Sequence, residues 1–339
     1  MMRVLGVESS CDDTAAAVLD GRRVLSSIVA SQDDVHRRFG GIVPELASRS
    51  HIRNVRSVIE RALVTAGLEL DQIDAVAATN GPGLVGSLLV GLSAAKAIAF
   101  ARDLPFVAVN HIEGHLLSAL LEEEVEFPYL ALVVSGGHTS LYFAEKLRSY
   151  RTLGATRDDA AGEAYDKVAK MLGLGFPGGP VLDKLARDGD PKAIRFPRAR
   201  LKNPLRSVES GSFEFSFSGL KTAVWQHLRD RPGELDPAAI ADIAASFQEA
   251  VVDMLLDTTG AALQSTQAPA LVIAGGVSAN SRLRQRAAEL SAARGVRLHI
   301  PPMRYCTDNA AMIALAGSFR LAAGERDSLT TNAYADLEL

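Results

Sequence analysis

Apolar and polar segments alternate at the start of the chain in a pattern that predicts a β-hairpin. Apolar residues at 4–7 are followed by a polar turn at 8–14, and a second apolar segment runs from 15 to 19. A similar unit recurs at 130–144, around the polar turn 135–139. Each turn ends in a threonine, Thr14 or Thr139. Such patterns indicate strand–turn–strand units, and their recurrence predicts a duplicated fold in which each half begins with a hairpin.

Further apolar segments predict an alternation of strands and helices, as in an α/β protein. Helical spacing of apolar residues is clearest at 43–66, which carries Ile52, Val55, Ile59, Leu63 and Ala66. The second half is predicted to be helix-rich from 158 to 187. The other expected elements are strands at 24–30, 75–78, 107–109 and 271–274 and helices at 84–100 and near 238–264.

Composition narrows the class of protein. With 339 residues, 47% of them hydrophobic, the chain can bury a large core and form more than one domain. The net charge of −4 predicts that any nucleic acid needs a local basic patch or a partner protein. The N-terminus lacks the apolar core of a signal peptide. The run 84–100 is too short and too polar to span a membrane. We therefore expect a cytoplasmic α/β protein with no membrane association.

Two histidines four residues apart, His111 and His115, open an apolar segment. On a helix, residues at this spacing share a face, so both imidazoles can bind one metal ion. A downstream carboxylate, Asp308, can supply a third ligand and leave coordination positions open for substrate. The same spacing also occurs on ordinary helix surfaces. The zinc peptidase motif His-Glu-x-x-His is an alternative, but it requires a glutamate directly after the first histidine, and that residue is Ile112.

Glycine-rich turns follow several predicted strands. Gly136 and Gly137 can expose backbone N–H groups to a phosphate. The buried strand 271–274 enters a Gly-Gly turn ahead of a basic helix, where Asn280 can hydrogen-bond a sugar or base. Ordinary tight turns are the alternative interpretation of both.

Other residues carry weaker signals. Cys11 and Cys306 are too few for a disulfide framework and are expected to be small buried residues, although both flank candidate site motifs. The segment 215–221 is either structural packing or a ligand contact. Three histidines without convergent partners are expected on the surface: His36, His51 and His227. A basic run in the irregular segment 190–215 is either a solvated loop or a nucleic-acid contact, with Phe196 able to stack on a base: Lys192, Arg195, Arg198, Arg200, Lys202 and Arg206.

Eight motifs, in order along nearly the whole chain, resemble the bacterial TsaD family of tRNA adenosine threonylcarbamoyltransferases. They are 8–14 (ESSCDDT), 43–49 (VPELASR), 81–84 (GPGL), 111–115 (HIEGH), 135–139 (SGGHT), 215–221 (FSFSGLK), 275–277 (GGV) with Asn280, and 307–309 (TDN). The resemblance implies a duplicated two-lobe, actin-like ATPase (sugar kinase-like) fold of mixed sheets flanked by helices. The expected division is lobe I at 1–109, against which a returning C-terminal helix at 310–339 packs, and lobe II at 110–309, with the metal and adenylate site at their interface.

The resemblance also implies a reaction. The threonylcarbamoyl group of threonylcarbamoyl-adenylate passes to N6 of adenosine 37, in tRNAs that read codons beginning with A, and AMP leaves. Asp12 and Asp13 are the candidates to take the N6 proton. Asp13 stands where many family members carry glutamate, so its reach differs from theirs.

By motif matching, one Fe or Zn ion per subunit would be held by His111, His115 and Asp308. The remaining candidates would bind the adenylate: Val134, Ser135, Gly136, Gly137 and His138 at its phosphate and acyl end, and Asp166, Gly179, Asp183 and Asn280 at its adenosine end. The implied partners are tRNA, a TsaB-like paralogue, a TsaE-like P-loop ATPase and a separate enzyme that makes the adenylate. The alternatives are a metallopeptidase and a non-catalytic actin-like nucleotide-binding module.

Overall fold

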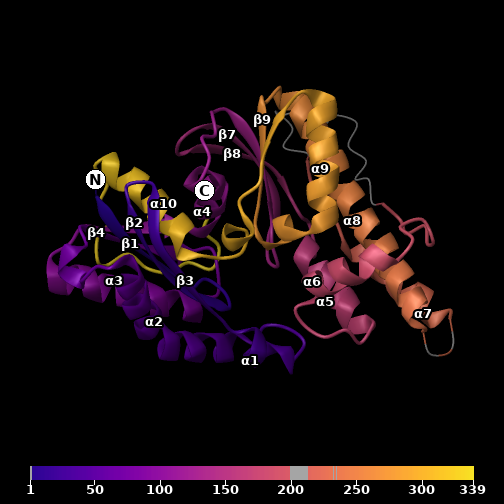
Figure 1. Ribbon diagram of the computed structural model, residues 1–339, viewed down its shortest axis with the longest axis horizontal. Coiled ribbons are helices and arrows are strands. Elements are labelled where there is room, and N and C mark those ends of the chain that lie inside the picture. The colour runs from indigo at the N-terminus through magenta and orange to yellow at the C-terminus, as the bar shows by residue number, and fades with distance from the viewer. Residues whose placement is uncertain (1, 199–212, 232, 234) are drawn as a thin grey trace. The chain divides into compact units, whose positions relative to one another are not determined.

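The structure is a computed structural model that describes residues 2–198, 213–231, 233 and 235–339. The chain folds into two compact units (Figure 1). Unit 1 comprises Met1–Glu123 and Thr307–Leu339, and unit 2 comprises Glu124–Cys306. The lobe boundaries after residues 109 and 309, with a site at the lobe interface, stay a prediction. The compact units themselves divide after Glu123 and Cys306, so the segment that carries both candidate histidines folds with unit 1.

Unit 1 is built on a five-stranded mixed sheet in the order β3-β2-β1-β4-β5. The hairpin of β1 and β2 is antiparallel, and β3 pairs with β2 in the same way. The next two pairings are parallel: β1 with β4, and β4 with β5. The strands are β1 (Arg3–Glu8), β2 (Asp13–Asp20), β3 (Arg23–Ser31), β4 (Ala75–Gly81) and β5 (Phe106–Asn110).

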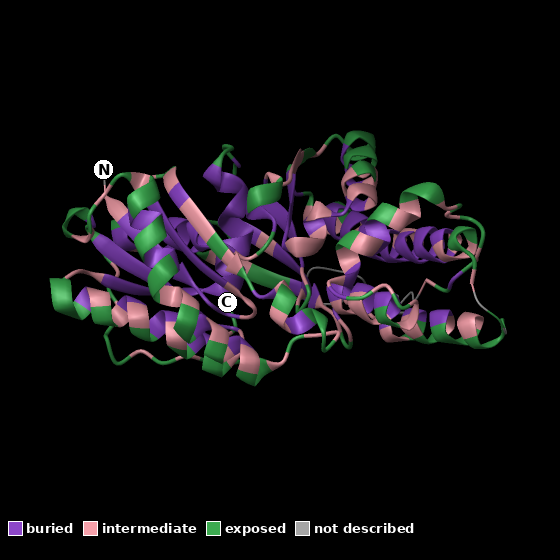
Figure 2. Cartoon of the chain, turned by 60° about the horizontal axis from the view of Figure 1, so that its bottom comes forward, coloured by how far each residue is buried: buried purple, intermediate pink, exposed green. Residues whose placement is uncertain are grey.

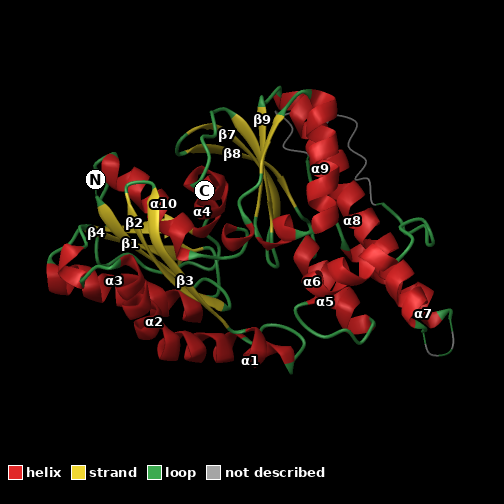
Figure 3. Cartoon of the chain, viewed as in Figure 1, coloured by secondary structure: helices red, strands yellow, loops and turns green. Residues whose placement is uncertain are grey.

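Helices cover both faces of this sheet (Figure 3). Leu5 and Val7 of β1 belong to a core cluster with Val58 and Leu92, from α2 and α3. Gly6, between them, faces α10 instead, because a Cβ there would lie 2.8 Å from that of Ala314. The helices are α1 (Asp33–Arg37), α2 (Pro44–Ala66), α3 (Val85–Arg102), α4 (His111–Leu117) and α10 (Ala310–Ala322), with 3₁₀ turns at Leu70–Gln72 and Ser118–Leu121.

Unit 2 contains a second five-stranded sheet, in the order β10-β9-β6-β7-β8. Its first hairpin, β6 and β7, is antiparallel, as is the pair β7 and β8. β6 and β9 are parallel, and so are β9 and β10. The strands are β6 (Tyr129–Val134), β7 (Thr139–Lys146), β8 (Ser149–Ala155), β9 (Ala270–Ala274) and β10 (Arg297–His299).

The helices of unit 2 pack around a core that includes the buried aromatic rings of Tyr165, Phe217 and Phe247. The long helix α8 contributes to this core, and many of its residues are buried (Figure 2). The helices are α5 (Ala161–Met171), α6 (Gly178–Leu185), α7 (Ser218–Arg229), α8 (Pro237–Thr266) and α9 (Ser281–Arg294), with 3₁₀ turns at Ala186–Asp188, Gly276–Ala279 and Met303–Tyr305.

The two sheets have the same topology, which confirms the predicted duplication. In each, a hairpin supplies the central strand and its one antiparallel neighbour, and a third strand pairs antiparallel with that neighbour. Two later strands add in parallel on the other side of the central strand. The expected α/β architecture of mixed sheets flanked by helices is therefore confirmed (Figure 3).

One sequence-based detail is wrong. The apolar spacing in α2 placed Ile52 on the buried face, but this side chain is 65% exposed. The neighbouring His51 is buried in its place. His51 has polar partners outside the helix, described below, which favour burial of its face of α2. A pattern of apolar residues gives no sign of such partners.

α3 is long and apolar enough to cross a membrane, judged by length and composition alone, and is the one such helix among the described residues. The expectation that the run 84–100 is too short and too polar for this is therefore wrong, because the helix extends to Arg102. It packs against α2 and β4 within unit 1, with Leu88, Leu92 and Ala99 buried.

A close approach of α10 to the sheet gives a first prediction. A Cβ on Gly317 would lie 2.4 Å from the Cβ of Ala77, which the strand backbone holds in place. We expect Gly317→Ala to lower the free energy of unfolding by roughly 1–3 kcal/mol, as overpacked cores do. Gly86→Ala in α3 is the matched control, because the nearest atom there is 3.4 Å away. It should be neutral or stabilising by up to about 1 kcal/mol. Equal stability of the two variants in urea unfolding would contradict this packing.

Candidate functional site

Three parallel strands of unit 1 end at one edge of the sheet and deliver polar side chains there. Glu8 ends β1, and Thr79 lies in the adjacent strand β4, one position beyond the paired residues Val7 and Ala78. β5 ends at Asn110, so that α4 begins with His111. Because parallel strands share their carboxyl-terminal edge, residues far apart in sequence are neighbours here.

The two histidines and Asp308 form a cluster that could hold a metal ion. Each offers a ligand atom, and these atoms lie within 4.8 Å of one another. The Nε2 atoms of His111 and His115 lie 3.5 Å and 3.1 Å from Oδ1 of Asp308. Ligands in a tetrahedral zinc site, with bonds of about 2.0–2.1 Å, are about 3.3 Å apart. The donor set and its spacing therefore fit a metal ion with little rearrangement.

Two asparagines fix the segments that carry these ligands. Oδ1 of Asn110 caps α4 by accepting from the N–H of Ile112, at 2.8 Å. Its amide group donates to the carbonyl of Leu337, at 3.1 Å. Asn309 caps α10 in the same manner, through the N–H of Met312 at 3.0 Å. Capped starts of this kind hold the first residues of a helix in one geometry, which places Asp308 directly before α10.

The electrostatics of this cluster favour positive charge. Burial alone lowers the pKa of His111, but the carboxylates of Asp308 and Glu8 outweigh burial and raise this pKa to about 9. The same neighbourhood holds the pKa of Glu8 below its ordinary value despite complete burial, mainly through His111. A metal ion would replace the proton as the charge that these carboxylates stabilise.

Asp12 lies at the end of the loop between β1 and β2, and Asp13 is the first residue of β2. Both lie in the field of Asp308. Burial, followed by repulsion from Asp308, raises the pKa of Asp12 to about 6 and that of Asp13 to about 8. Oδ1 of Asp13 is buried without a hydrogen-bond partner among the described residues. Carboxyl groups with pKa values near neutrality are suited to general acid–base work, so this loop is a candidate catalytic segment.

His51 supports the same loop, and the expectation that it lies on the surface is wrong. The ring is fully buried. Nδ1 lies 2.8 Å from Oγ1 of Thr14, and Nε2 lies 3.0 Å from the carbonyl oxygen of Cys11. Burial lowers the pKa of His51, so the neutral ring donates from Nε2 and accepts the Thr14 hydroxyl at Nδ1. His51 thus contacts the residues directly before and after Asp12 and Asp13, and so holds this segment in place.

The other two histidines are not simple surface groups either. His36 is fully buried, and its Nδ1 accepts from the N–H of Val43 at 3.3 Å. His227 is partly buried and packs edge-on against Phe196, with ring centroids 5.9 Å apart. The partner of His36 is close in sequence, whereas His227 packs against an apolar ring that is distant in sequence. Apolar periodicity alone places neither ring.

Cys306 is fully buried, as expected, with Sγ 3.3 Å from the carbonyl of Pro301. Cys11 is only partly buried, so the expectation is wrong for this residue. Loss of solvation, with a contribution from Asp12, raises the pKa of Cys11 well above its ordinary value, so its thiol stays protonated. A protonated thiol is a poor metal ligand and a poor nucleophile.

The second group of predicted residues lies in unit 2, at the matching edge of its sheet. After β6, the turn 135–139 is closed by a hydrogen bond of 2.7 Å from the N–H of Ser135 to the carbonyl of His138. The start of α5 packs directly on this turn, and a Cβ on Gly162 would lie 2.6 Å from the carbonyl oxygen of Ser135. Added Cβ atoms at Gly136 and Gly137 would meet nothing within 4 Å. The turn therefore presents open backbone near a helix start, as an anion site requires.

The Gly-Gly turn after β9 borders the same edge. Gly275 has φ of 90°, and a Cβ there would lie 2.4 Å from the carbonyl oxygen of Val134. Only glycine fits this position. Asn280 caps α9 through the N–H of Leu283, at 2.9 Å, and its amide group donates to Oε1 of Gln248 at 2.7 Å. Val134 is fully buried, so its backbone is the part that could reach a ligand.

Asp166, Gly179 and Asp183 belong to the adjacent α5 and α6. Oδ1 of Asp166 accepts from the N–H of Gly178 at 2.7 Å, which fixes the start of α6. Oδ1 of Asp183 accepts from the hydroxyl of Ser281 at 2.7 Å. A Cβ on Gly179 would meet nothing within 4 Å. These contacts join α5, α6 and α9 at one end of unit 2, where Asp183 and Asn280 lie next to each other in contact with α9.

The motif 215–221 packs structurally. Phe215 and Phe217 are buried and stack with ring centroids 6.3 Å apart. Asp158 accepts from the N–H of Phe217 at 2.7 Å and from the hydroxyl of Ser218 at 2.8 Å, so it caps the start of α7.

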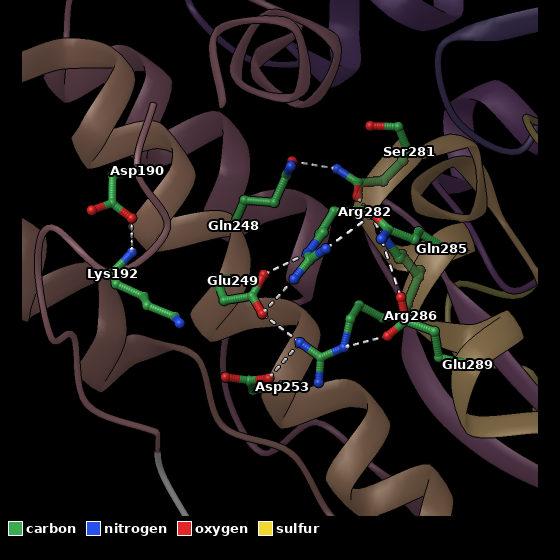
Figure 4. A network of polar contacts seen from close by, with 12 residues as sticks. Asp190, Lys192, Gln248, Glu249, Asp253, Ser281, Arg282, Gln285, Arg286 and Glu289 are labelled. Atoms are coloured by element: carbon green, nitrogen blue, oxygen red, sulfur yellow. Dashed lines mark hydrogen bonds and ion pairs between the residues drawn. The ribbon is translucent and has the colours of Figure 1, made fainter. Parts of the chain in front are cut away.

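In the basic segment 190–215, one of the described arginines forms an internal ion pair. Arg198 lies 3.1 Å from Asp253, which also pairs with Arg286 at 3.1 Å. Glu249 extends the network to Arg282 and Arg286 and joins α8 to α9 (Figure 4). Phe196 is only 3% exposed, so the expected stacking of its ring on a tRNA base is wrong. Arg200, Lys202 and Arg206 lie outside the described residues.

Sequence reasoning missed three supporting residues: Glu8, His51 and Asp158. Glu8 carried a usable signal, since it is a charged residue at the end of an otherwise apolar predicted strand. Charged groups are rarely buried without a partner, so its position indicated a polar site. His51 and Asp158 find their partners only through the tertiary fold.

The fold and both candidate sites define an actin-like ATPase-fold protein. Component A of the (R)-2-hydroxyglutaryl-CoA dehydratase of Acidaminococcus fermentans shares the fold, with a TM-score of 0.55, 15% identity, and coverage of 95% of this chain and 100% of that one. Full-length HypF, solved in a phosphate- and nucleotide-bound form, matches with a TM-score of 0.63 and 14% identity over 96% of this chain and 47% of its own.

Sequence comparison identifies the family. The family model for TsaD, tRNA N6-adenosine threonylcarbamoyltransferase, matches residues 23–315. Proteins of that name from Geobacter sp. (strain M21) and Anaeromyxobacter dehalogenans (strain 2CP-1) are 57% and 55% identical, over 95% and 98% of this chain and 92% and 98% of their own lengths. The chain therefore belongs to the TsaD family, and its activity is transfer of a threonylcarbamoyl group to N6 of a tRNA adenosine.

The raised pKa of Asp13 gives a second prediction. An acid with a folded-state pKa of about 8 holds a proton that the unfolded chain has lost, so the stability of the metal-free protein falls as pH rises from 3.8 towards 8. Asp13→Asn removes this ionisation and should raise Tm at pH 8 more than at pH 5. Each 1 kcal/mol gained corresponds to roughly 2–4 °C. Asp71→Asn, at an exposed carboxylate, is the control. A gain for Asp13→Asn that is independent of pH would contradict the shift.

Proposed function

We propose that the unit 1 cluster of this transferase holds one iron or zinc ion at His111, His115 and Asp308. The convergence of two Nε2 atoms on one carboxylate oxygen is the observation that carries this proposal. When bound, the metal would supply Lewis-acid polarisation and a template for the substrate. The buried carboxylates around it would stabilise its charge.

The donor substrate that we propose is threonylcarbamoyl-adenylate, bound at the open edge of unit 2. Its mixed anhydride has a good leaving group. The backbone N–H groups of Gly136 and Gly137 would receive the phosphate and acyl end and stabilise negative charge as it develops. Asp166, Gly179, Asp183 and Asn280 would bind the adenosine end. The open space beside Gly136, Gly137 and Gly179 supports this assignment.

The transfer step needs a group that accepts a proton from N6 of adenosine 37. A bond forms between N6 and the carbamoyl carbon, the bond from that carbon to the phosphate oxygen breaks, and AMP leaves. We propose that Asp12 or Asp13 takes the proton. Their raised pKa values support this role, because a base with a pKa near the working pH accepts a proton effectively and also releases it.

We also propose that the chain works in the cytoplasm with a TsaB-like paralogue and a TsaE-like P-loop ATPase. Supporting a protein partner, the outer faces of α2 and α3 expose large apolar side chains: Ile52, Val64, Val85, Leu89 and Phe100. Gathered apolar groups on a surface are typical of interaction sites.

The metal assignment gives a third prediction. The purified protein should carry one iron or zinc ion per chain, and His111→Ala and His115→Ala should each lose it after dialysis, because two remaining ligands bind weakly. Both variants should also lose transferase activity, measured by mass analysis of tRNA nucleosides. His227→Ala, outside the cluster, should keep the ion. Full metal occupancy in the double variant would refute the assignment.

The basic segment gives a fourth prediction, on tRNA binding. Lys192, Arg195 and Arg198 line one open pocket, together with Asp253 and Asp257. Of the three basic residues, Arg198 is tied to Asp253 by an ion pair. We propose that the first two contact phosphates. The double variant Lys192→Ala/Arg195→Ala should weaken tRNA binding and lower its log–log salt slope by about 0.7–0.9 per lost contact.

Arg198→Ala is the matched control, since it removes the same charge from the same segment but breaks an internal ion pair. It should leave the salt slope unchanged. If the double variant also keeps the wild-type slope, the segment does not touch phosphate, and the arginines of 36–61 or a partner subunit would bind the tRNA.

A further inference from the structure

Glu8 is a fully buried carboxylate at the end of β1. It accepts a hydrogen bond from the N–H of Ser10 and another, at 2.6 Å, from the hydroxyl of Thr79. Its third partner is Nδ1 of His111, at 3.0 Å. An ionised carboxylate is costly to bury unless each oxygen is hydrogen-bonded, and here both oxygens are.

The duplicated fold shows that this strand position does not require a carboxylate. Val7 pairs with Ala78 in unit 1 as Val133 pairs with Ala274 in unit 2. The residue that corresponds to Glu8 in unit 2 is therefore Val134, which is fully buried. The same sheet topology thus accepts an apolar residue at this point. The carboxylate of Glu8 is therefore explained by a requirement of the site and not by a requirement of the strand.

His111 is held between two carboxylates. Nδ1 lies 3.0 Å from Oε2 of Glu8 and 3.2 Å from Oγ of Ser10, so the charged carboxylate is the nearer partner. Nε2 lies 3.5 Å from Oδ1 of Asp308. A ring that donates its proton from Nδ1 to Glu8 presents the lone pair of Nε2 to the cluster, which is the tautomer that a metal ligand needs. His115 offers an internal contrast: its Nδ1 is buried with no hydrogen-bond partner among the described residues.

We propose that Glu8 is a positioning residue for metal binding, which fixes the tautomer and ring orientation of His111 so that Nε2 points at the metal. The inference rests on the proposed metal site. A hydrogen-bonded carboxylate behind a histidine ligand also makes the ring more basic and so a stronger ligand. Of the two histidines, His111 is then the pre-oriented one.

The test compares Glu8→Gln with Thr79→Val in zinc-loaded protein. Glu8→Gln keeps the size of the side chain but removes the charge and one acceptor. The zinc Kd, measured by chelator competition, should rise 10–100-fold, the usual effect of losing such a partner. Thr79→Val removes a different hydrogen bond to the same carboxylate and leaves His111 untouched, so its Kd should change far less.

A spectroscopic readout separates positioning from general structural support. The ¹⁵N shifts of His111 in the metal-free protein at high pH should show one dominant tautomer, with the proton on Nδ1. In Glu8→Gln they should move towards a mixture, while those of Thr79→Val stay in place. Glu8→Asp serves as the partial rescue and replaces Glu8→Gln if that variant does not fold.

The outcomes also separate this inference from the metal assignment. If His111→Ala/His115→Ala loses zinc while Glu8→Gln binds it with wild-type affinity and unchanged ¹⁵N shifts, the positioning role is refuted and the metal site stands. Equal loss of affinity in Glu8→Gln and Thr79→Val, with unchanged shifts, would also refute it. Zinc retained by the histidine double variant would refute the metal site itself.

Discussion

The parallel alignment of β1, β4 and β5 is the constraint on which the site of unit 1 depends. It brings Glu8, Thr79 and Asn110 to one edge of the sheet, although these residues are distant in sequence. α4 starts where β5 ends, so His111 emerges at that edge. α10 returns to pack on the sheet so closely that only glycine fits at Gly317, and Asp308, just before it, meets both histidines.

The same arrangement concentrates negative charge where water is largely excluded. Glu8, Asp12, Asp13 and Asp308 lie close enough for each to shift the pKa of a neighbouring group. Folding alone does not reward such a cluster, because each buried charge costs free energy. A cation at the proposed metal site would relieve the repulsion. A cluster of acidic groups that costs stability in this way is typical of a functional site.

Sequence reasoning predicted the parts of this molecule that depend on local patterns. The two hairpins, the helix at α2 and the strand β9 follow from apolar periodicity. Asp308 could be offered as a third ligand from its residue type and neighbouring motif, and the family resemblance supported this choice, because no spacing rule connects residues so far apart. His51 was misplaced, because only the tertiary fold brings its partners, Cys11 before β2 and Thr14 within β2, to α2. Phe196 was misjudged because a basic sequence context suggested exposure.

The duplication explains how one topology supports two kinds of chemistry. At corresponding edges, unit 1 presents Glu8 and Thr79 where unit 2 presents Val134 and Gly275. Side chains of the first pair carry the charge and hydrogen bonds that a cation cluster needs. In the second, an apolar residue and a glycine offer no polar side chain, so the backbone is the part that could contact a ligand, and N–H groups near helix starts favour anions. Opposite electrostatic preferences therefore arise from substitutions at a few strand ends, while the strand order and pairing of both sheets stay the same.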